Sequence, residues 1–188
     1  MNGKKAALLS DGFPADTLCR AVDLYQSSHW KHILSDEGWN SWTGIALLSK
    51  DGELGSLGEG SQYYPTSLLR SSAEFQEVLA YFKCPLHRVR VLKLDPNHGQ
   101  IHEHVDEMPE SHRLARLQLP LSGAADTYFY SVGERVPMQE GELWYIDVTL
   151  PHSVVNQGKV ERLSMVIDCE LNDWLENLIN SSNFTLNA

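Results

Sequence analysis

Apolar and polar residues alternate in short runs throughout the second half of the chain, as they do in β-strands with one buried face. Turn-forming residues interrupt the runs, for example in the segment DPNHG at 95–99. Seven strands are predicted on this basis, over residues 87–94, 100–106, 115–121, 126–130, 142–147, 152–156 and 161–168. Many short strands joined by turns indicate a β-sandwich or a jelly roll.

A helical pattern, with apolar residues three and four positions apart, is found in three segments. The first covers residues 14–27 and begins with Pro14, which suits a first helical turn. The second follows Ser71 and Glu74, which together match the capping box of a helix N-terminus. The third begins near Asn172, and the polar residues 180–188 behind it are expected to be frayed.

The pattern between the first two helices is less regular. The aromatic residues of the segment 28–42 are interpreted as part of the core rather than as the lining of a substrate entrance. Residues 44–50 form an apolar run that ends in Asp51 and Gly52, a hairpin signal. The glycines and serines of residues 52–61 predict a surface loop, for which a lid over the site is one hypothesis.

A length of 188 residues suits a single domain with a substantial core. The fold class expected is mainly β with flanking helices, around a double-stranded β-helix (jelly-roll) core. Within it we expect a helical and loop part at about 1–85, the jelly-roll core at about 86–170 and a C-terminal helix at about 172–180.

Composition excludes some partners. The 15 basic and 25 acidic residues give a formal charge of -10, which disfavours nucleic acid and anionic membranes because both attract basic surfaces. The three cysteines form no CxxC pair and are interpreted as reduced thiols. The N-terminal apolar run is too short for a secretory signal, and no stretch has the length of a membrane span, so a cytoplasmic protein is predicted.

Histidines and a carboxylate recur at a spacing that suits a metal. His102, His104 and Asp106 alternate along one predicted strand and therefore share a face, so either histidine can act together with Asp106. A single histidine is more often structural, but His152, at a later strand start, provides a third candidate ligand. Two histidines and one carboxylate leave coordination positions open, as in non-haem Fe(II) oxygenases.

Ten residues after His152, Arg162 begins a strand face that Ser164 shares. A buried guanidinium needs a counter-charge, and the carboxylate of a ligand provides one, with Ser164 adding a hydrogen bond. The alternative is a surface salt bridge of Arg162 with Asp147 or Glu161.

Three runs resemble the aspartyl/asparaginyl β-hydroxylases, a family of Fe(II)- and 2-oxoglutarate-dependent enzymes that includes hydroxylases of free amino acids such as proline. They are LKLDPNHGQIHEHVD, then RLQLPL, then WYIDVTLPHSVVNQGKVERLSMVIDC. The resemblance covers roughly residues 72–170. It implies that His104, rather than His102, binds Fe(II) together with Asp106 and His152. Because some members have glycine at the position of Asp106, its presence here favours hydroxylation over halogenation.

The resemblance also implies which residues hold the co-substrate. The arginine that matches Arg162 grips the distal carboxylate of 2-oxoglutarate in that family, and the one that matches Arg116 helps to hold the co-substrate near the metal. Arg116 and Gln118 share a strand face, and Gln118 stands where the family often has histidine. The reaction so implied consumes O2 and 2-oxoglutarate, releases succinate and carbon dioxide, and hydroxylates a C–H bond.

The leading hypothesis is therefore a dioxygenase that hydroxylates an amino acid, either free or as a unit of a peptide or a carrier-bound intermediate. One alternative is a cupin-type metalloenzyme without a 2-oxo acid, with ligands His102, His104, His152 and either Glu107 or Glu110. Another is a jelly-roll binding module without catalysis.

Overall fold

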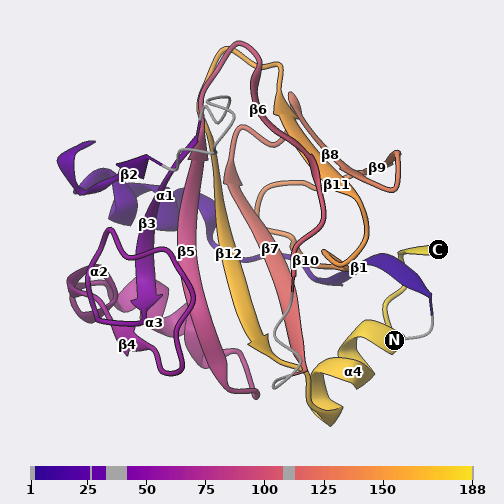
Figure 1. Cartoon of the computed structure of the whole chain (residues 1–188), viewed down its shortest axis with the longest axis horizontal. Coiled ribbons are helices and arrows are strands. Elements are labelled where there is room, and N and C mark those ends of the chain that lie inside the picture. Colours follow the sequence, from indigo (N-terminus) through magenta and orange to yellow (C-terminus); the bar gives the residue numbers. More distant parts are fainter. Residues whose placement is uncertain (1–2, 26, 33–41, 108–112, 188) are drawn as a thin grey trace.

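In the computed structural model, residues 3–25, 27–32, 42–107 and 113–187 are described. Two antiparallel sheets face each other, a larger one that crosses the centre of Figure 1 and a smaller one at its upper right. This is the predicted jelly-roll arrangement, mainly β with flanking helices.

Within the described residues the larger sheet has nine strands. Its order is β13 (Thr185–Asn187), β1 (Lys4–Ser10), β10 (Leu143–Ile146), β7 (Leu114–Ser122), β12 (Arg162–Glu170), β5 (Leu86–Leu94), β3 (Trp42–Ser49) and β2 (Lys31–His32), and β4 (Tyr64–Pro65) pairs with β3. The smaller sheet has the order β6 (Gly99–His104), β11 (His152–Asn156), β8 (Thr127–Ser131) and β9 (Glu134–Val136). All seven predicted strands are present, with small differences at their ends.

Helices pack on the outer face of the larger sheet. They are α1 (Ala15–Asp23), the 3-10 turn η1 (Ser27–His29), α2 (Ser67–Ser71), α3 (Ala73–Ala80) and α4 (Asp173–Asn180). Leu18 of α1, Phe75 of α3 and Leu175 of α4 are fully buried in this layer. None of the helices described is long and apolar enough to span a membrane.

The central strand β12 shows how alternation divides the two faces. Leu163, Met165 and Ile167 join the core under the helices, whereas Val166 lines a cavity between the sheets. Because side chains alternate along a strand, Arg162 lies on the same inner face as Val166. The predicted division of this strand is thus confirmed, and it directs an arginine into the space between the sheets.

The turn between β5 and β6 places the first metal-ligand strand. Asn97 and His98 have positive φ angles of 55° and 76°, and a Cβ on Gly99 would lie 2.2 Å from the carbonyl oxygen of Asp95. Only glycine permits so close an approach at this position. The buried Asn156 side chain donates to the carbonyls of Asp95 and Val160 at 3.1 and 2.8 Å, which ties the turn to the end of β11.

Two expectations about the ends of elements are wrong, and the N-terminal part contains more strand than expected. The N-terminal cap of α3 is Ser72, whose Oγ accepts from the amide of Phe75 at 3.3 Å, and not Ser71, which ends α2. Residues 185–187 are not frayed but form β13, which pairs with β1, because the ring of Phe184 packs against Trp144 with centroids 5.5 Å apart. The N-terminal part, expected to be helices and loops, also provides β1 and β3 to the larger sheet.

Candidate metal centre

Strand pairing brings the two histidines together. His104 at the end of β6 lies opposite His152 at the start of β11, and their ring centroids are 4.2 Å apart. Asp106 lies beyond the end of β6, and its amide donates to the carbonyl of Val148 at 2.9 Å. The expected strand through residue 106 therefore ends earlier. Even so, Asp106 Oδ1 lies 3.8 Å from His104 Nε2, and Asp106 Oδ2 lies 3.8 Å from His152 Nε2.

The hydrogen-bond partners of the two rings suit metal binding. Nδ1 of His104 lies 2.7 Å from the carbonyl oxygen of His102, and Nδ1 of His152 lies 3.0 Å from that of Leu150. A proton on Nδ1 satisfies these contacts and leaves the Nε2 lone pairs directed toward Asp106. Burial lowers the pKa of His152, which favours the neutral ring that a metal requires.

Among the residues described, these three side chains form the one group able to offer histidine, cysteine or carboxylate atoms to a single ion, with all ligand atoms within 4.8 Å of one another. The group contains His104 and not His102, which is exposed. Of the alternative cupin ligands, Glu107 lines the neighbouring cavity without joining the group, and Glu110 lies outside the described residues.

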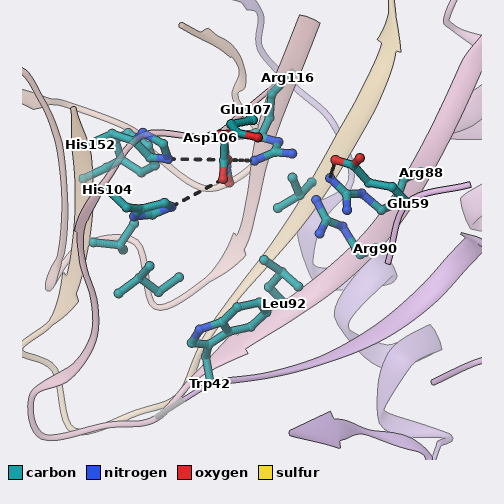
Figure 2. A pocket seen from close by; sticks show the side chains of 15 residues that line it. Trp42, Glu59, Arg88, Arg90, Leu92, His104, Asp106, Glu107, Arg116 and His152 are labelled. Atoms are coloured by element: carbon teal, nitrogen blue, oxygen red, sulfur yellow. Dashed lines mark hydrogen bonds and ion pairs between the residues drawn. The ribbon is translucent and has the colours of Figure 1, made fainter. Parts of the chain in front are cut away.

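A cavity of about 210 Å³ opens beside the three ligands, as Figure 2 shows. The smaller sheet lines it with the apolar side chains of Phe129 and Val154. The larger sheet carries the guanidinium groups of Arg88, Arg90 and Arg116, and Leu92 follows Arg90 on the same face of β5. One side of the cavity is thus suited to an anion and the other to hydrocarbon.

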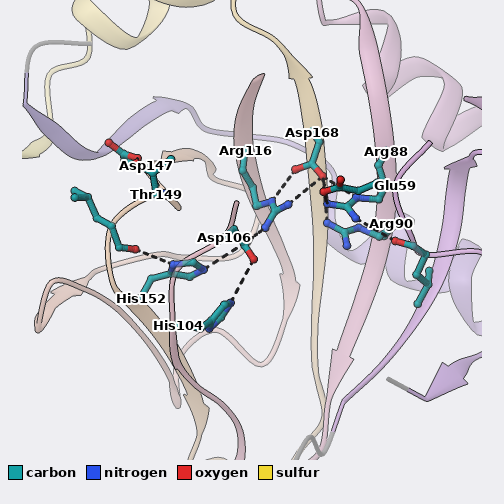
Figure 3. Close-up of polar contacts among 12 residues, drawn as sticks. Glu59, Arg88, Arg90, His104, Asp106, Arg116, Asp147, Thr149, His152 and Asp168 are labelled. Carbon is teal, nitrogen blue, oxygen red and sulfur yellow. Dashed lines mark hydrogen bonds and ion pairs between the residues drawn. The ribbon is translucent and has the colours of Figure 1, made fainter. Parts of the chain in front are cut away.

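Arg116 contacts two carboxylates. Its Nε and Nη2 donate to Oδ1 and Oδ2 of Asp168 at 2.6 and 3.1 Å, and its Nη1 donates to Asp106 Oδ2 (Figure 3). Every nitrogen of this guanidinium is therefore already bonded. The sequence predicts that Arg116 holds the co-substrate. In the structure it forms ion pairs with Asp168 and Asp106.

Asp168 also contacts the other two arginines. Arg88 Nε donates to Asp168 Oδ2 at 2.9 Å and Arg90 Nη2 donates to the same oxygen at 3.3 Å. Burial by itself raises the pKa of Asp168, but Arg116, Arg90 and Arg88 outweigh this effect and hold the pKa well below its usual range. Burial lowers the pKa of Arg90 to about 9, so that it stays a cation at neutral pH.

Arg90 retains donor capacity. It is 6% exposed, and its Nε is buried without a hydrogen-bond partner among the described residues. An unpaired buried donor is costly, and a ligand oxygen in the cavity relieves that cost.

Arg162, Ser164 and Gln118 lie farther along the same inner face. Arg162 is 4% exposed, and burial lowers its pKa to about 10. The alternative of a surface salt bridge is wrong, because Glu161 pairs with Lys93 at 3.1 Å and Asp147 accepts from Thr149 at 2.6 Å. Within the described part of the chain Arg162 has no carboxylate partner, and it is not among the residues that line the 210 Å³ cavity.

Gln118 joins this arrangement through its oxygen. Ser164 Oγ donates to Gln118 Oε1 at 3.1 Å, and Gln118 lines the cavity. The structure therefore brings Gln118 to the same cavity as the metal ligands and connects it to Ser164, while Arg162 is the first residue of β12 and does not line that cavity.

The sequence reasoning missed Arg88 and Arg90 as cavity residues. The available signal is the alternation of Arg88 and Arg90 in the predicted strand HRVRVLKL. Arginine is seldom fully buried, so two arginines on one face of a central strand indicate a ligand or a buried carboxylate beside them. In the aromatic segment, Trp30 and Trp42 both pack against the core, as predicted, and Trp42 also lines the cavity. Residues 33–41 lie outside the described residues. In the loop 52–61, the carbonyl of Leu57 accepts from Arg88 Nη1 at 3.3 Å.

Comparison with solved structures confirms the fold. The viral collagen prolyl hydroxylase of Paramecium bursaria Chlorella virus-1 aligns with a TM-score of 0.55 and 14% identity, over 90% of this chain and 98% of the viral one. The non-haem alpha-ketoglutarate-dependent epimerase SnoN from nogalamycin biosynthesis aligns with a TM-score of 0.59 and 11% identity, over 98% of this chain and 86% of SnoN. At these identities the likeness concerns the fold alone.

Sequence comparison is more specific. L-proline cis-4-hydroxylase from Rhizobium meliloti (strain 1021) is 25% identical over 177 residues, which cover 90% of this chain but only 62% of that enzyme. The sequence pattern described as Aspartyl/Asparaginyl beta-hydroxylase matches residues 18–171. Because this match extends well beyond half of the chain, the protein belongs to the aspartyl/asparaginyl β-hydroxylase family.

Proposed function

We propose that this protein is an Fe(II)- and 2-oxoglutarate-dependent dioxygenase that hydroxylates a C–H bond of an amino acid, free or as a unit of a peptide or carrier-bound intermediate. The observation that carries the proposal is the approach of His104, Asp106 and His152 to within 4.8 Å of one another beside a cavity, in a chain of this family.

The three side chains suit Fe(II). Two neutral imidazoles and one carboxylate are a common ligand set for non-haem iron and leave positions for other ligands. Once bound, the metal, 2-oxoglutarate and O2 supply the oxidising chemistry, in which the 2-oxo acid becomes succinate and carbon dioxide and a C–H becomes C–OH. The chain's own part is to orient the reactants and to exclude water from the apolar wall around Phe129 and Val154.

For the co-substrate we propose Arg162, with Ser164 and Gln118, as the partners of the distal carboxylate. The support is electrostatic: Arg162 is a buried cation without a described counter-charge, a state that an incoming carboxylate stabilises. Gln118 offers its amide nitrogen, since its oxygen already accepts from Ser164. A co-substrate contact of Arg116 stays a prediction.

For the substrate we propose that its own carboxylate binds at Arg90. The Nε of Arg90, which has no hydrogen-bond partner among the described residues, and the place of Arg90 in the cavity wall support this assignment. In β5 Arg90 precedes Leu92 and Leu94, and Leu94 is the partner of Arg162 in β12. Since strands advance about 3.3 Å per residue, the two arginines lie toward different ends of the same face, and the carboxylates of substrate and co-substrate do not compete for one site.

The predicted cytoplasmic location also stays a prediction.

The central experiment measures succinate after anaerobic loading with Fe(II) and addition of O2, 2-oxoglutarate and a panel of free amino acids, with mass spectrometry for products that gain one oxygen atom. We expect succinate release coupled to hydroxylation of at least one amino acid. Absence of turnover, together with absence of 2-oxoglutarate binding to the Mn(II)-loaded protein, contradicts the proposal. Activity without 2-oxoglutarate that survives Arg162→Ala supports the cupin alternative instead.

Substrate analogues test the role of Arg90. An amino acid and its carboxamide differ at the group that is proposed to meet the guanidinium, where the amide replaces a charged acceptor oxygen by a neutral NH2 donor. We expect the carboxamide to have a KM at least about tenfold higher, because a charge-assisted hydrogen bond contributes about 1.5–3 kcal/mol. Arg90→Gln removes that discrimination, while Arg113→Gln, a change in an exposed arginine, keeps it. Equal KM values for acid and amide in the unsubstituted enzyme contradict this assignment.

A further inference from the structure

Asp168 is a buried carboxylate that the proposed reaction does not use. It is 3% exposed and accepts hydrogen bonds from Arg116, Arg88 and Arg90. Arg116 binds it in a bidentate manner, with both nitrogens of one edge of the guanidinium on the two carboxylate oxygens. Asp168 and Arg116 are also direct partners in the pairing of β12 with β7, so the backbone supports this geometry.

Arg116 connects this buried carboxylate to the metal ligand. While its Nε and Nη2 point to Asp168, its Nη1 points to Asp106, as Figure 3 shows. Asp106 lies outside β6, so its backbone is held by the bond of its amide to the Val148 carbonyl rather than by strand pairing, and Arg116 contacts its side chain. His104 and His152, in contrast, lie within paired strands.

We infer that Asp168 is a positioning residue of the metal centre: through Arg116 it sets the orientation in which Asp106 meets the metal. The inference rests on the proposed metal site. Arg116 is suited to the task because its rigid fork can hold one carboxylate on one edge and reach a second with the remaining nitrogen. Lysine offers a single nitrogen and cannot bond both carboxylates in the same way.

The arrangement also explains why Asp168 is charged and buried. Without it, three guanidinium groups around one cavity wall repel one another, and Arg116 has no fixed partner on the side away from the metal. With it, Arg116 lies on the far side of Asp106 from the two histidines, where it can bond Asp106 without taking up a histidine nitrogen. Outer partners of metal ligands act in this way, and their loss typically lowers metal affinity about 10- to 100-fold.

The test is Co(II) binding to the apoprotein, followed by calorimetry and by the visible absorption of the bound ion. It needs neither 2-oxoglutarate nor a substrate. We expect Asp168→Asn and Arg116→Lys each to weaken Co(II) binding about tenfold or more and to change the absorption spectrum. Arg88→Lys is the matched control, because Arg88 contacts Asp168 but not Asp106, and we expect its affinity to stay within about twofold of the unsubstituted protein.

The double variant D168N/R116K separates positioning from general loss of structure. If Asp168 acts through Arg116, the two losses do not add. The double variant then binds Co(II) about as tightly as the single variant with the lower affinity. Losses that multiply, or a folded Asp168→Asn protein that binds Co(II) with unchanged affinity and spectrum, overturn the inference. Should Asp168→Asn fail to fold, Arg116→Lys against Arg88→Lys decides the same question.

The result is independent of the reaction proposed above. Loss of Co(II) affinity in the variants together with absent 2-oxoglutarate turnover in the unsubstituted protein leaves the inference standing and contradicts the proposed function. Unchanged Co(II) affinity in the variants, together with 2-oxoglutarate turnover by the unsubstituted protein, contradicts the inference and supports the proposed function. An unsubstituted protein that binds no Co(II) overturns both.

Discussion

His104 and His152 lie directly opposite each other on the antiparallel strands β6 and β11, with ring centroids 4.2 Å apart. The two residues belong to distant parts of the chain, and it is the register of one strand pair that makes them neighbours. A slip of one residue turns a side chain to the other face of a sheet. The metal centre therefore depends on the turns that fix this register as much as on the ligands themselves.

The turn before β6 provides the first prediction. Gly99→Ala places a methyl group within 2.2 Å of the Asp95 carbonyl oxygen, so that the backbone must move, and we expect a loss of about 1–3 kcal/mol in the free energy of unfolding. Gly55→Ala is the control, because its new Cβ meets only the Lys31 side chain at 3.9 Å. Urea denaturation measures both, and equal stabilities contradict the prediction.

The metal ligands provide the second. His152→Ala removes a ligand, and we expect Co(II) binding to weaken by more than the roughly 10- to 100-fold that follows loss of an outer partner. His102→Ala is expected to keep the affinity of the unsubstituted protein, because Nδ1 of His104 contacts the backbone carbonyl of His102, which the substitution retains. A loss of metal in His102→Ala contradicts the choice of His104 and revives the cupin ligand set.

Arg162 provides the third. Arg162→Met replaces a buried cation without a described counter-charge by an apolar chain of similar length, so we expect the ligand-free protein to be as stable as before or more stable. The same variant is expected to lose the increase in Tm that 2-oxoglutarate gives to the Mn(II)-loaded protein. Thermal unfolding with and without 2-oxoglutarate measures both effects. An undiminished shift in Arg162→Met means that the co-substrate binds elsewhere.

The pH dependence of stability provides the fourth. The pKa of Asp168 is depressed in the folded protein, whereas an aspartate in an unfolded chain has a pKa of about 3.9. Its contribution is therefore complete above about pH 5 and is lost as the pH falls below about 4 toward the folded pKa. Asp168→Asn is expected to be about 3–5 kcal/mol less stable near neutral pH, because it leaves buried arginines without their partner.

Urea titrations between pH 3 and pH 7 measure that difference. We expect the stability gap between the unsubstituted protein and Asp168→Asn to be constant from pH 5 to pH 7 and to shrink on acidification below pH 4. A gap that does not change with pH means that the charge of Asp168 is unimportant and that only its shape matters.

The β8–β9 hairpin provides the fifth. Val132 has a φ of 50° in a turn completed by Gly133, although β-branched residues avoid this conformation, and it is 43% exposed. Val132→Asn is expected to raise the free energy of unfolding by about 1 kcal/mol. Val160→Asn is the control: Val160 is also exposed (61%) but is not among the described residues with positive φ, so we expect no gain. A Val132→Asn protein that is less stable argues that the valine side chain has a contact of its own.

The sequence by itself determined the elements and the faces of the strands. Alternation of apolar and polar residues is a local property, so β12 could be assigned one face with Leu163 and Met165 and another with Arg162 and Ser164, as observed. The motif resemblance identified His104, Asp106 and His152, and the structure brings these three together. The local pattern of apolar and polar residues does not reveal β13. Its pairing with β1 depends on contacts between residues far apart in the sequence, such as Phe184 and Trp144.

Only the tertiary structure decided how the charged residues inside the molecule are partnered. Arg88, Arg90, Arg116 and Asp168 come from three strands, and their ion pairs depend on the order and register of β5, β12 and β7. Local sequence encodes which way a side chain points along its own strand. It does not encode which strand lies beside it, and since Coulomb energies between buried groups depend on separations of a few ångströms, the electrostatics of the site follow from the assembled sheet.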